Sequence, residues 1–250
     1  MTIRRFFKKK RTVALDELGG TPDGALVIVG DDGDHLHVTP PRVASSLRFL
    51  INRLHLPGGE GLPARVALTS ALRGEGVTYM TRSLGSVIAY DLERTVAIVD
   101  LNWRDPPSSE ADAAESPPPT LAAAVEDGLD VTDIIHPTAN PRLSLVPPGA
   151  VARPRRPAMA ASRALEDVID KLAQQFDHLL LDLPPVLAAS DAVNLAQLAE
   201  GVVLVVQQGV TSTTQVEAAI AELGGREILG VLLNRADSSI PPRLRKMLGG

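Results

Sequence analysis

Short runs of apolar residues recur along most of this chain, and the segments between them space their apolar residues as helices do. The runs are apolar at successive positions rather than at alternate ones, so both faces of each strand should be buried. Such strands are typical of a parallel sheet between two layers of helices. The predicted strands span residues 65–69, 95–99, 143–146, 178–181, 202–206 and 228–233. The sequence therefore predicts an α/β fold with a doubly wound, mainly parallel sheet.

Three segments between these runs carry apolar residues at helical spacing, and they span residues 77–88, 165–176 and 216–223. Before the first strand, residues 25–38 predict a hairpin and residues 43–54 an amphipathic helix. We therefore expect an extension over residues 1–60 that includes a basic tip, a core domain over residues 61–236, and a tail over residues 237–250. Residues 105–120 contain five prolines and predict a mobile surface loop.

Composition limits the classes of function. The chain is 44% apolar and 22% charged, which is typical of a soluble globular protein. No apolar run approaches the roughly 18 residues needed to span a bilayer, and the start lacks the apolar stretch of a secretory signal. We therefore expect the protein in the cytoplasm. The chain has no cysteine, which excludes disulfides, thiol catalysis, thiolate zinc sites and iron–sulfur clusters.

The charge is distributed unevenly along the chain. The net charge is −5, but the first eleven residues contain six basic residues and no acidic one, so the remainder carries −11. An acidic body with seven aromatic residues argues against nucleic acid as a partner. Residues 1–11 are either a solvated end or a segment that attaches the protein reversibly to an anionic membrane surface, at the inner face of the cell membrane.

The loop after the first predicted strand has features of a phosphate-binding loop. It runs from Thr69 to Thr78, leads directly into a helix, and contains Gly74 and Gly76. Glycines at such a junction let backbone N–H groups and the positive end of the helix approach a phosphate. Val77 stands where the phosphate-loop pattern has lysine, whereas Thr78 keeps the hydroxyl that can bind magnesium. A plain tight turn is the alternative interpretation.

Polar residues also follow three other predicted strands. They are Asp100 and Asn102 after the second strand, Asp182 after the fourth and Asn234 after the last. In an open parallel sheet these positions lie at the same edge, where ligands bind. A carboxylate there can hold a magnesium-bound water, although helix capping or turn formation would also explain each acid by itself.

Together, these segments resemble the cytoplasmic ATPase domain of the bacterial protein-tyrosine autokinases of capsule and exopolysaccharide export. That family lies within the wider ParA/MinD-like class of P-loop proteins, which have a deviant phosphate loop. The similarity covers about residues 62–234 and is carried, in the right order, by residues 69–78, 96–104, 127–135, 143–149, 176–185, 191–192 and 228–234. The resemblance implies a P-loop NTPase fold that uses ATP and magnesium.

The resemblance also implies roles for individual residues. Amides of the phosphate loop would contact phosphate oxygens, within a nucleotide-binding segment made of Ala71, Leu72, Arg73, Gly74, Glu75, Gly76, Val77 and Thr78. Thr78, Asp100 and Asp182 would bind magnesium. As catalytic residues, Asp100 would help to place the attacking hydroxyl and Asp182 would orient the metal's water. Asn234 would face adenine.

Departures from the family's pattern predict impaired chemistry. Val77 removes the cation that neutralises the β- and γ-phosphates, which should weaken ATP binding about ten- to a hundredfold. Turnover should fall further, because the activation free energy should rise by about 2.7 to 4 kcal/mol. Asn102 stands where the family usually has a second aspartate, so magnesium binding should also be weak. Arg73, in the loop, is the alternative source of a cation.

Two further differences concern kinase action and assembly. The family phosphorylates a tyrosine-rich tail, whereas the tyrosines of this chain are Tyr79 and Tyr90, in the helix after the loop. The family's Glu-x-x-Arg-x-x-Arg pattern for ring assembly is matched by Arg42, Ser45 and Arg48, so one of three positions is kept. The sequence therefore does not support a homo-oligomeric ring of the family's kind.

The sequence thus favours a catalytically impaired, kinase-like P-loop protein that regulates or scaffolds the synthesis and export of a capsular polysaccharide or exopolysaccharide. Its expected partner is an inner-membrane protein that controls polysaccharide chain length or export. One alternative is an active tyrosine kinase or ATPase that uses Arg73 or a cation from a neighbouring subunit. Another is a ParA/MinD-like positioning ATPase held on a membrane or on DNA by residues 1–11.

Overall fold

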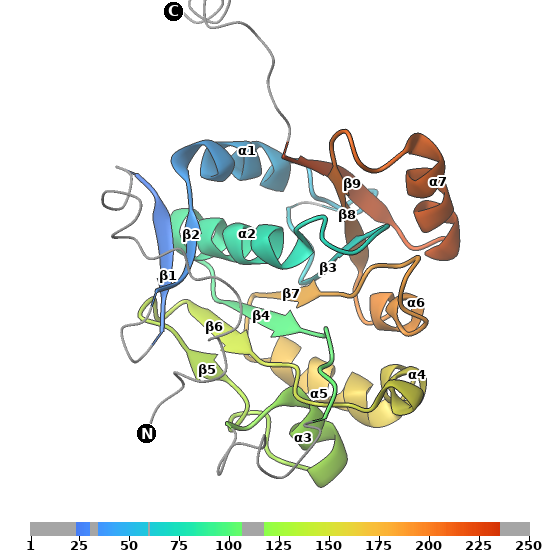
Figure 1. The fold of residues 1–250 in the computed structure, drawn as a ribbon. Coiled ribbons are helices and arrows are strands. Elements are labelled where there is room, and N and C mark those ends of the chain that lie inside the picture. The colour runs from blue at the N-terminus through green and yellow to red at the C-terminus, as the bar shows by residue number, and fades with distance from the viewer. Residues whose placement is uncertain (1–23, 31–34, 60, 107–117, 236–250) are drawn as a thin grey trace, which may run out of the picture.

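A seven-stranded sheet forms the centre of the fold, with the strand order β5-β6-β4-β7-β3-β8-β9 (Figure 1). The computed structural model describes residues 24–30, 35–59, 61–106 and 118–235. The strands of this sheet are β3 (Arg65–Ser70), β4 (Val96–Asp100), β5 (His136–Pro137), β6 (Leu143–Val146), β7 (His178–Asp182), β8 (Gly201–Gln207) and β9 (Ile228–Asn234). Neighbouring strands are parallel except β5, which pairs antiparallel with β6. The predicted doubly wound, mainly parallel α/β sheet is confirmed.

Helices cover both faces of the sheet (Figure 1). They are α1 (Pro41–Ile51), α2 (Val77–Asp91), α3 (Leu121–Asp127), α4 (Arg156–Ala160), α5 (Arg163–Ala173), α6 (Ala192–Ala196) and α7 (Thr213–Glu222). Helices α1 and α2 pack on one face, in a core with Ile98 and Leu180. Helices α3 to α7 contribute to the core on the other face, with Val99 and Leu181. Consecutive strand residues therefore enter opposite cores, which is why these strands are continuously apolar.

A hairpin before the sheet packs on the same side as α2. Its strands β1 (Leu26–Val29) and β2 (His35–Thr39) pair antiparallel, as predicted. The ring of His37 packs edge-on against Tyr79, with 4.9 Å between ring centroids, and its Nε2 lies 2.9 Å from the Ser83 hydroxyl. Burial, together with the charge of Arg82, lowers the pKa of His37 to about 3. The neutral ring therefore joins the hairpin to α2 without adding charge at pH 7.

Three predicted segments lie wholly or mainly outside the described residues. They are the basic tip (1–11), the tail (237–250) and most of the proline-rich loop (105–120). Membrane contact by the tip and mobility of the loop therefore stay predictions. Within the described part of the chain, no helix has both the length and the apolar character needed to cross a bilayer.

The last strand departs from the sequence prediction. The continuously apolar run at residues 228–233 predicts burial on both faces, but Val231 is 49% exposed and Leu233 is 52% exposed on β9. Strand β9 is an edge strand, which pairs with β8 on one side only. Within α7 only Ala219 is fully buried, and Leu223 directly after the helix joins the same core, so α7 leaves part of β9 uncovered. The prediction of full burial is therefore wrong for this strand.

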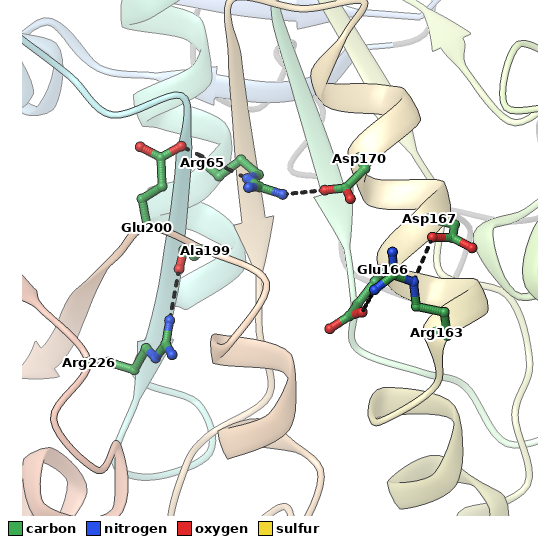
Figure 2. Close-up of polar contacts among 8 residues, drawn as sticks. All are labelled: Arg65, Arg163, Glu166, Asp167, Asp170, Ala199, Glu200 and Arg226. Atoms are coloured by element: carbon green, nitrogen blue, oxygen red, sulfur yellow. Dashed lines mark hydrogen bonds and ion pairs between the residues drawn. The ribbon is translucent and has the colours of Figure 1, made fainter.

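Charged contacts connect the segments at which three strands begin (Figure 2). At the start of β3, Arg65 contacts Asp170 on α5, with 2.6 Å between Nη1 and Oδ1, and lies 3.9 Å from Glu200, just before β8. Before β9, Arg226 donates to the carbonyl oxygen of Ala199 at 3.5 Å. Exposed ion pairs of this kind each contribute little to stability. They lie at the amino edge of the sheet, opposite the edge that carries the predicted site.

Candidate functional site

Asp100 and Asp182 meet at the carboxyl edge of the sheet, on the side covered by α2. Strands β4 and β7 are adjacent and parallel, and their register pairs Asp100 with Asp182. Two residues earlier, Ile98 and Leu180 point into the core that α2 covers. Because alternate strand residues face the same side, both carboxylates also face α2, which carries Thr78 in its first turn. The structure thus brings together the three residues predicted to bind magnesium.

The loop between β3 and α2 has the backbone of an anion-binding turn. Gly74 and Gly76 both have positive φ angles, of 85° and 93°, which a residue with a side chain rarely adopts. Gly76 is the residue before α2, and no side chain caps the helix. The amides of its first turn, at Val77 and Thr78, therefore lie where a phosphate could accept their hydrogen bonds.

Glu75 points into the protein rather than toward solvent. It is 1% exposed. Its carboxylate accepts hydrogen bonds from the Leu72 amide at 2.6 Å and the Gln207 amide at 3.1 Å, and a short one from the Thr211 hydroxyl. These donors join two parts of the loop to the end of β8 and the turn that follows. Sequence reasoning placed Glu75 in the nucleotide-binding loop, and the structure shows that its side chain holds the shape of that loop.

Asn234 also contacts the phosphate loop. It is 8% exposed, its amide donates to the Glu75 carbonyl oxygen at 2.7 Å, and its Oδ1 accepts from the Arg235 amide at 2.7 Å. A Cβ at Gly76 would collide with its side-chain nitrogen, which explains why a glycine is needed there. Contact between Asn234 and adenine stays a prediction.

A groove lies beside the phosphate loop. It has a volume of about 740 Å³ and is lined by Gly76 and Tyr79, by Arg42 on α1, and by Asn234 and Arg235 at the end of β9. This volume lies within the range of small-molecule sites. The predicted adenine-facing residue therefore lines a space that could hold a base next to the phosphates.

The two residues that decide the charge of the loop have different surroundings. Val77 is half-buried and packs against the core on the α2 side of the sheet. Arg73 is exposed. An aliphatic side chain thus fills the place of the expected lysine, and the arginine proposed as its substitute points to solvent.

The carboxylate of Asp182 is buried and makes no hydrogen bond of ordinary length, although Thr78 and Asn102 act on it as donors. The residue is 1% exposed, and neither side-chain oxygen has a partner at that length. Burial and the nearby Asp100 charge raise the pKa of Asp182 from 3.8 to about 7, while Thr78, Arg82 and Asn102 act to lower it. Buried polar atoms nearly always have partners, and these two oxygens leave room for a ligand to bind beside them.

Asp100 is held by the residue that replaces the family's second aspartate. Its Oδ1 accepts from the Asn102 backbone amide at 2.9 Å and from the Asn102 side-chain amide at 3.1 Å. The same side chain donates to the Asp182 carbonyl oxygen at 3.0 Å. Burial raises the pKa of Asp100, and the Asn102 bonds with the charges of Arg82 and Arg104 oppose this. An aspartate at 102 could not donate these side-chain bonds.

The donor set fits a magnesium ion. Magnesium prefers oxygen ligands and commonly binds one or two carboxylates together with substrate phosphates. Thr78, Asp100 and Asp182 supply a hydroxyl and two carboxylates beside the phosphate loop. Among the described residues, no group of three or more histidine or acidic side chains could hold a metal ion, so this site has two carboxylates at most. The roles of these residues as magnesium ligands stay a prediction.

Arg82 is a residue of this site that sequence reasoning missed. It lies on α2 four residues after Thr78, and its charge acts on both Asp100 and Asp182. The i to i+4 spacing from Thr78 could have identified it, because residues so spaced share one face of a helix.

Replacing Glu75 with glutamine should lower the free energy of unfolding by about 1 to 3 kcal/mol. The side-chain NH₂ group of glutamine would face one of the donors whose hydrogen bond Glu75 accepts, and that donor would be left without an acceptor. Urea unfolding at pH 7 would measure the change. Glu93→Gln is the matched control, since Glu93 is exposed and pairs loosely with Arg142 at 3.4 Å. Equal changes in the two variants would show that the buried bonds of Glu75 do not hold the loop.

Comparison with curated proteins identifies relatives along most of the chain. No family model matches it. The tyrosine-protein kinase CpsD of Streptococcus agalactiae is 30% identical over 177 residues, which cover 70% of this chain and 76% of CpsD. The succinoglycan biosynthesis transport protein ExoP of Rhizobium meliloti is 26% identical over 184 residues, which cover 69% of this chain and 22% of ExoP.

Solved structures show the same fold. The kinase domain of the Escherichia coli tyrosine kinase ETK superposes with a TM-score of 0.65 at 20% identity, covering 84% of this chain and 82% of that one. The cell division ATPase MinD of Pyrococcus furiosus superposes with a TM-score of 0.54 at 27% identity, covering 75% and 79%. With the likeness to CpsD, these matches confirm the expected ParA/MinD-like P-loop fold, and the chain belongs to the family of bacterial tyrosine-protein kinases.

Proposed function

We propose that this protein is a catalytically impaired member of its family, a pseudokinase that regulates or scaffolds the assembly and export of a cell-surface polysaccharide. The observation that carries the proposal is Val77, an aliphatic residue packed where the phosphate loop needs a cation. The remainder of the site has the form of a nucleotide site. A protein of this kind would keep the fold and its surfaces while it loses efficient phosphoryl transfer.

The retained parts support weak binding of Mg-ATP. Amides at the start of α2 would donate hydrogen bonds to the phosphate oxygens, and Thr78, Asp100 and Asp182 would hold magnesium. When bound, magnesium would neutralise the charge of the β- and γ-phosphates. The loop itself is held in shape by the Glu75 carboxylate and by the Asn234 amide.

The missing cation supports impaired catalysis. Phosphoryl transfer depends almost entirely on positioning and on charges that stabilise the transferring group. Val77 contributes no charge, and the exposed side chain of Arg73 points to solvent. The hydroxyl of Tyr90 donates to the Val27 carbonyl oxygen at 3.1 Å, and Tyr79 packs against His37. Neither tyrosine offers the tail substrate that the family resemblance implies.

The residues at the ring-assembly positions, Arg42, Ser45 and Arg48, differ from the family's pattern at two of three places. Arg48, the one residue of the pattern that is kept, makes two bonds to Asp91 at the end of α2, at 2.8 and 3.1 Å. Ser45 is exposed and carries no charge to pair with a neighbouring subunit. These features support action with a different partner rather than in a ring of identical subunits.

The polysaccharide assignment comes from the relatives. ExoP is named as a transport protein of succinoglycan biosynthesis, and CpsD as a tyrosine-protein kinase. For this chain, the partner would be an inner-membrane protein that controls polysaccharide chain length or export. Residues 1–11, with six basic residues, would hold the protein at the anionic inner face of that membrane.

Complementation of a deletion strain would test the proposal. Because phosphoryl transfer is not required of a scaffold, Asp100→Asn and Thr78→Ala should restore polysaccharide yield and chain length to the wild-type level. The wild-type gene and the empty vector set the two ends of the scale, and immunoblots would confirm equal protein levels. Failure of both variants at normal protein levels would contradict the proposal, because it would show that the protein needs an intact Mg-ATP site for its function.

A further inference from the structure

The face of α2 that carries Thr78 also carries Arg82 and Gly85. Residues at these spacings lie above one another on a helix. Gly85 marks where this face touches the sheet, because a Cβ there would lie 2.7 Å from Cδ1 of Ile98 on β4. The stripe formed by Thr78, Arg82 and Gly85 therefore faces β4.

The geometry of this contact places Arg82 beside the carboxylate pair. Asp100 lies two residues after Ile98, about 6.6 Å further along the strand and on the same face. Arg82 lies three residues before Gly85, which is about 4.5 Å along the helix. This displacement points the same way as the step from Ile98 to Asp100 along β4. Side chains of a helix also lean toward its N-terminus, so the guanidinium extends toward Asp100 and its register partner Asp182.

A hydrogen bond to the hairpin also holds the side chain of Arg82 in place. Nη1 of Arg82 donates to the carbonyl oxygen of Leu36 on β2 at 3.3 Å. The hairpin and α2 are fixed to each other by the adjacent contact of His37 with Ser83. The arginine is therefore held between the hairpin and the sheet, and its charge interacts with both carboxylates.

We propose that Arg82 is a fixed counter-charge for the Asp100–Asp182 pair and that it weakens the binding of a divalent cation to that pair. This inference rests on the magnesium site of the proposed function. The guanidinium partly compensates the buried carboxylate of Asp182 and the half-buried one of Asp100, so the ligand-free site stays folded. The same positive charge repels an arriving cation. Impairment of the site thus has a second source, separate from Val77.

Binding of Mn²⁺ to the nucleotide-free, full-length protein would test the proposal. Arg82→Gln keeps a donor for the Leu36 carbonyl oxygen but removes the charge, and it should bind Mn²⁺ at least about tenfold more tightly than the wild type. Arg82→Lys should bind it as the wild type does. Arg142→Gln removes a charge at the far edge of the sheet and should change nothing. Equal affinities in the wild type and Arg82→Gln would overturn the proposal.

Unfolding of the same variants gives a second readout. Arg82→Gln should destabilise the protein more in the wild-type background than in an Asp182→Asn background. In the Asp182→Asn background, only the negative charge of Asp100 remains for Arg82 to compensate. If Arg82→Gln does not fold but the double variant does, the proposal is supported. Equal losses in both backgrounds, or failure of both to fold, would show that Arg82 has a packing role only. None of these measurements uses ATP, so they are independent of the test on Val77.

Discussion

Replacing Asp182 with asparagine should stabilise the ligand-free protein at pH 8 by up to about 4 kcal/mol. The carboxylate is buried with no hydrogen bond of ordinary length, and burial and the Asp100 charge raise its pKa to about 7 although Thr78, Arg82 and Asn102 oppose the shift. A group with a raised pKa binds its proton more strongly in the folded protein than in the unfolded chain. Its contribution to stability is therefore present at low pH and is lost as the pH rises to about 7.

Urea unfolding between pH 4 and pH 9 in the presence of EDTA would measure this effect. The free energy of unfolding of the wild type should fall across the interval between pH 4 and pH 7, relative to Asp182→Asn, and the difference should stay constant above it. Asp170→Asn is the matched control, because Asp170 is an exposed partner of Arg65. Wild-type and Asp182→Asn curves that run parallel at every pH would show that Asp182 is not a strained carboxylate.

Magnesium should stabilise the wild type but not the Asp182→Asn variant. A cation that binds the ionised pair stabilises the folded state by mass action. Addition of Mg²⁺ at pH 8 should therefore stabilise the wild type and leave Asp182→Asn almost unchanged. A gain of equal size in both would place the metal elsewhere.

Replacing Val77 with lysine should tighten the binding of Mg-ATP by about ten- to a hundredfold, since a charged donor contributes roughly 1.5 to 3 kcal/mol. Val77 opens α2, at the position from which a lysine reaches the β- and γ-phosphates. The phosphate loop is already shaped by Glu75 and Asn234. The added cation would therefore enter a loop that already has the shape needed to hold the phosphates.

Val77→Met is the control for this experiment, because it adds length without charge. It should bind Mg-ATP as weakly as the wild type does. Arg73→Ala should also leave the affinity unchanged, since Arg73 is exposed. An unchanged affinity in Val77→Lys, with a loss in Arg73→Ala, would assign the phosphate charge to Arg73.

Local patterns of the sequence were sufficient to predict the sheet and the meeting of its acids. Continuous apolar runs are typical of strands buried on both faces. Asp100 and Asp182 end two such runs, and the two strands are adjacent in the sheet. The exposure of Val231 and Leu233 could not be predicted in this way. It depends on the order of strands in the sheet and on how much of β9 is covered by α7.

Side-chain direction limited what could be predicted at the site. The loop sequence places Glu75 near the phosphates, but its buried carboxylate depends on donors at Leu72 and Gln207, which are distant from each other in the chain. In the sequence, Arg82 resembles any other polar helix residue. Its position beside the carboxylates depends on the packing of α2 against β4 and against the hairpin. The short strand β5 and the helices α3 and α6 were also missed, because each is too short to show a period.

Isothermal titration of Mg-ATP into the wild-type protein, paired with an assay of phosphate release, decides whether Val77 leaves the triphosphate without its counter-charge. The expected result is an affinity at least about tenfold weaker than that of Val77→Lys, with no steady hydrolysis. Tight binding by the wild type with steady phosphate release would show that another cation serves the site, and the protein would then be a working enzyme.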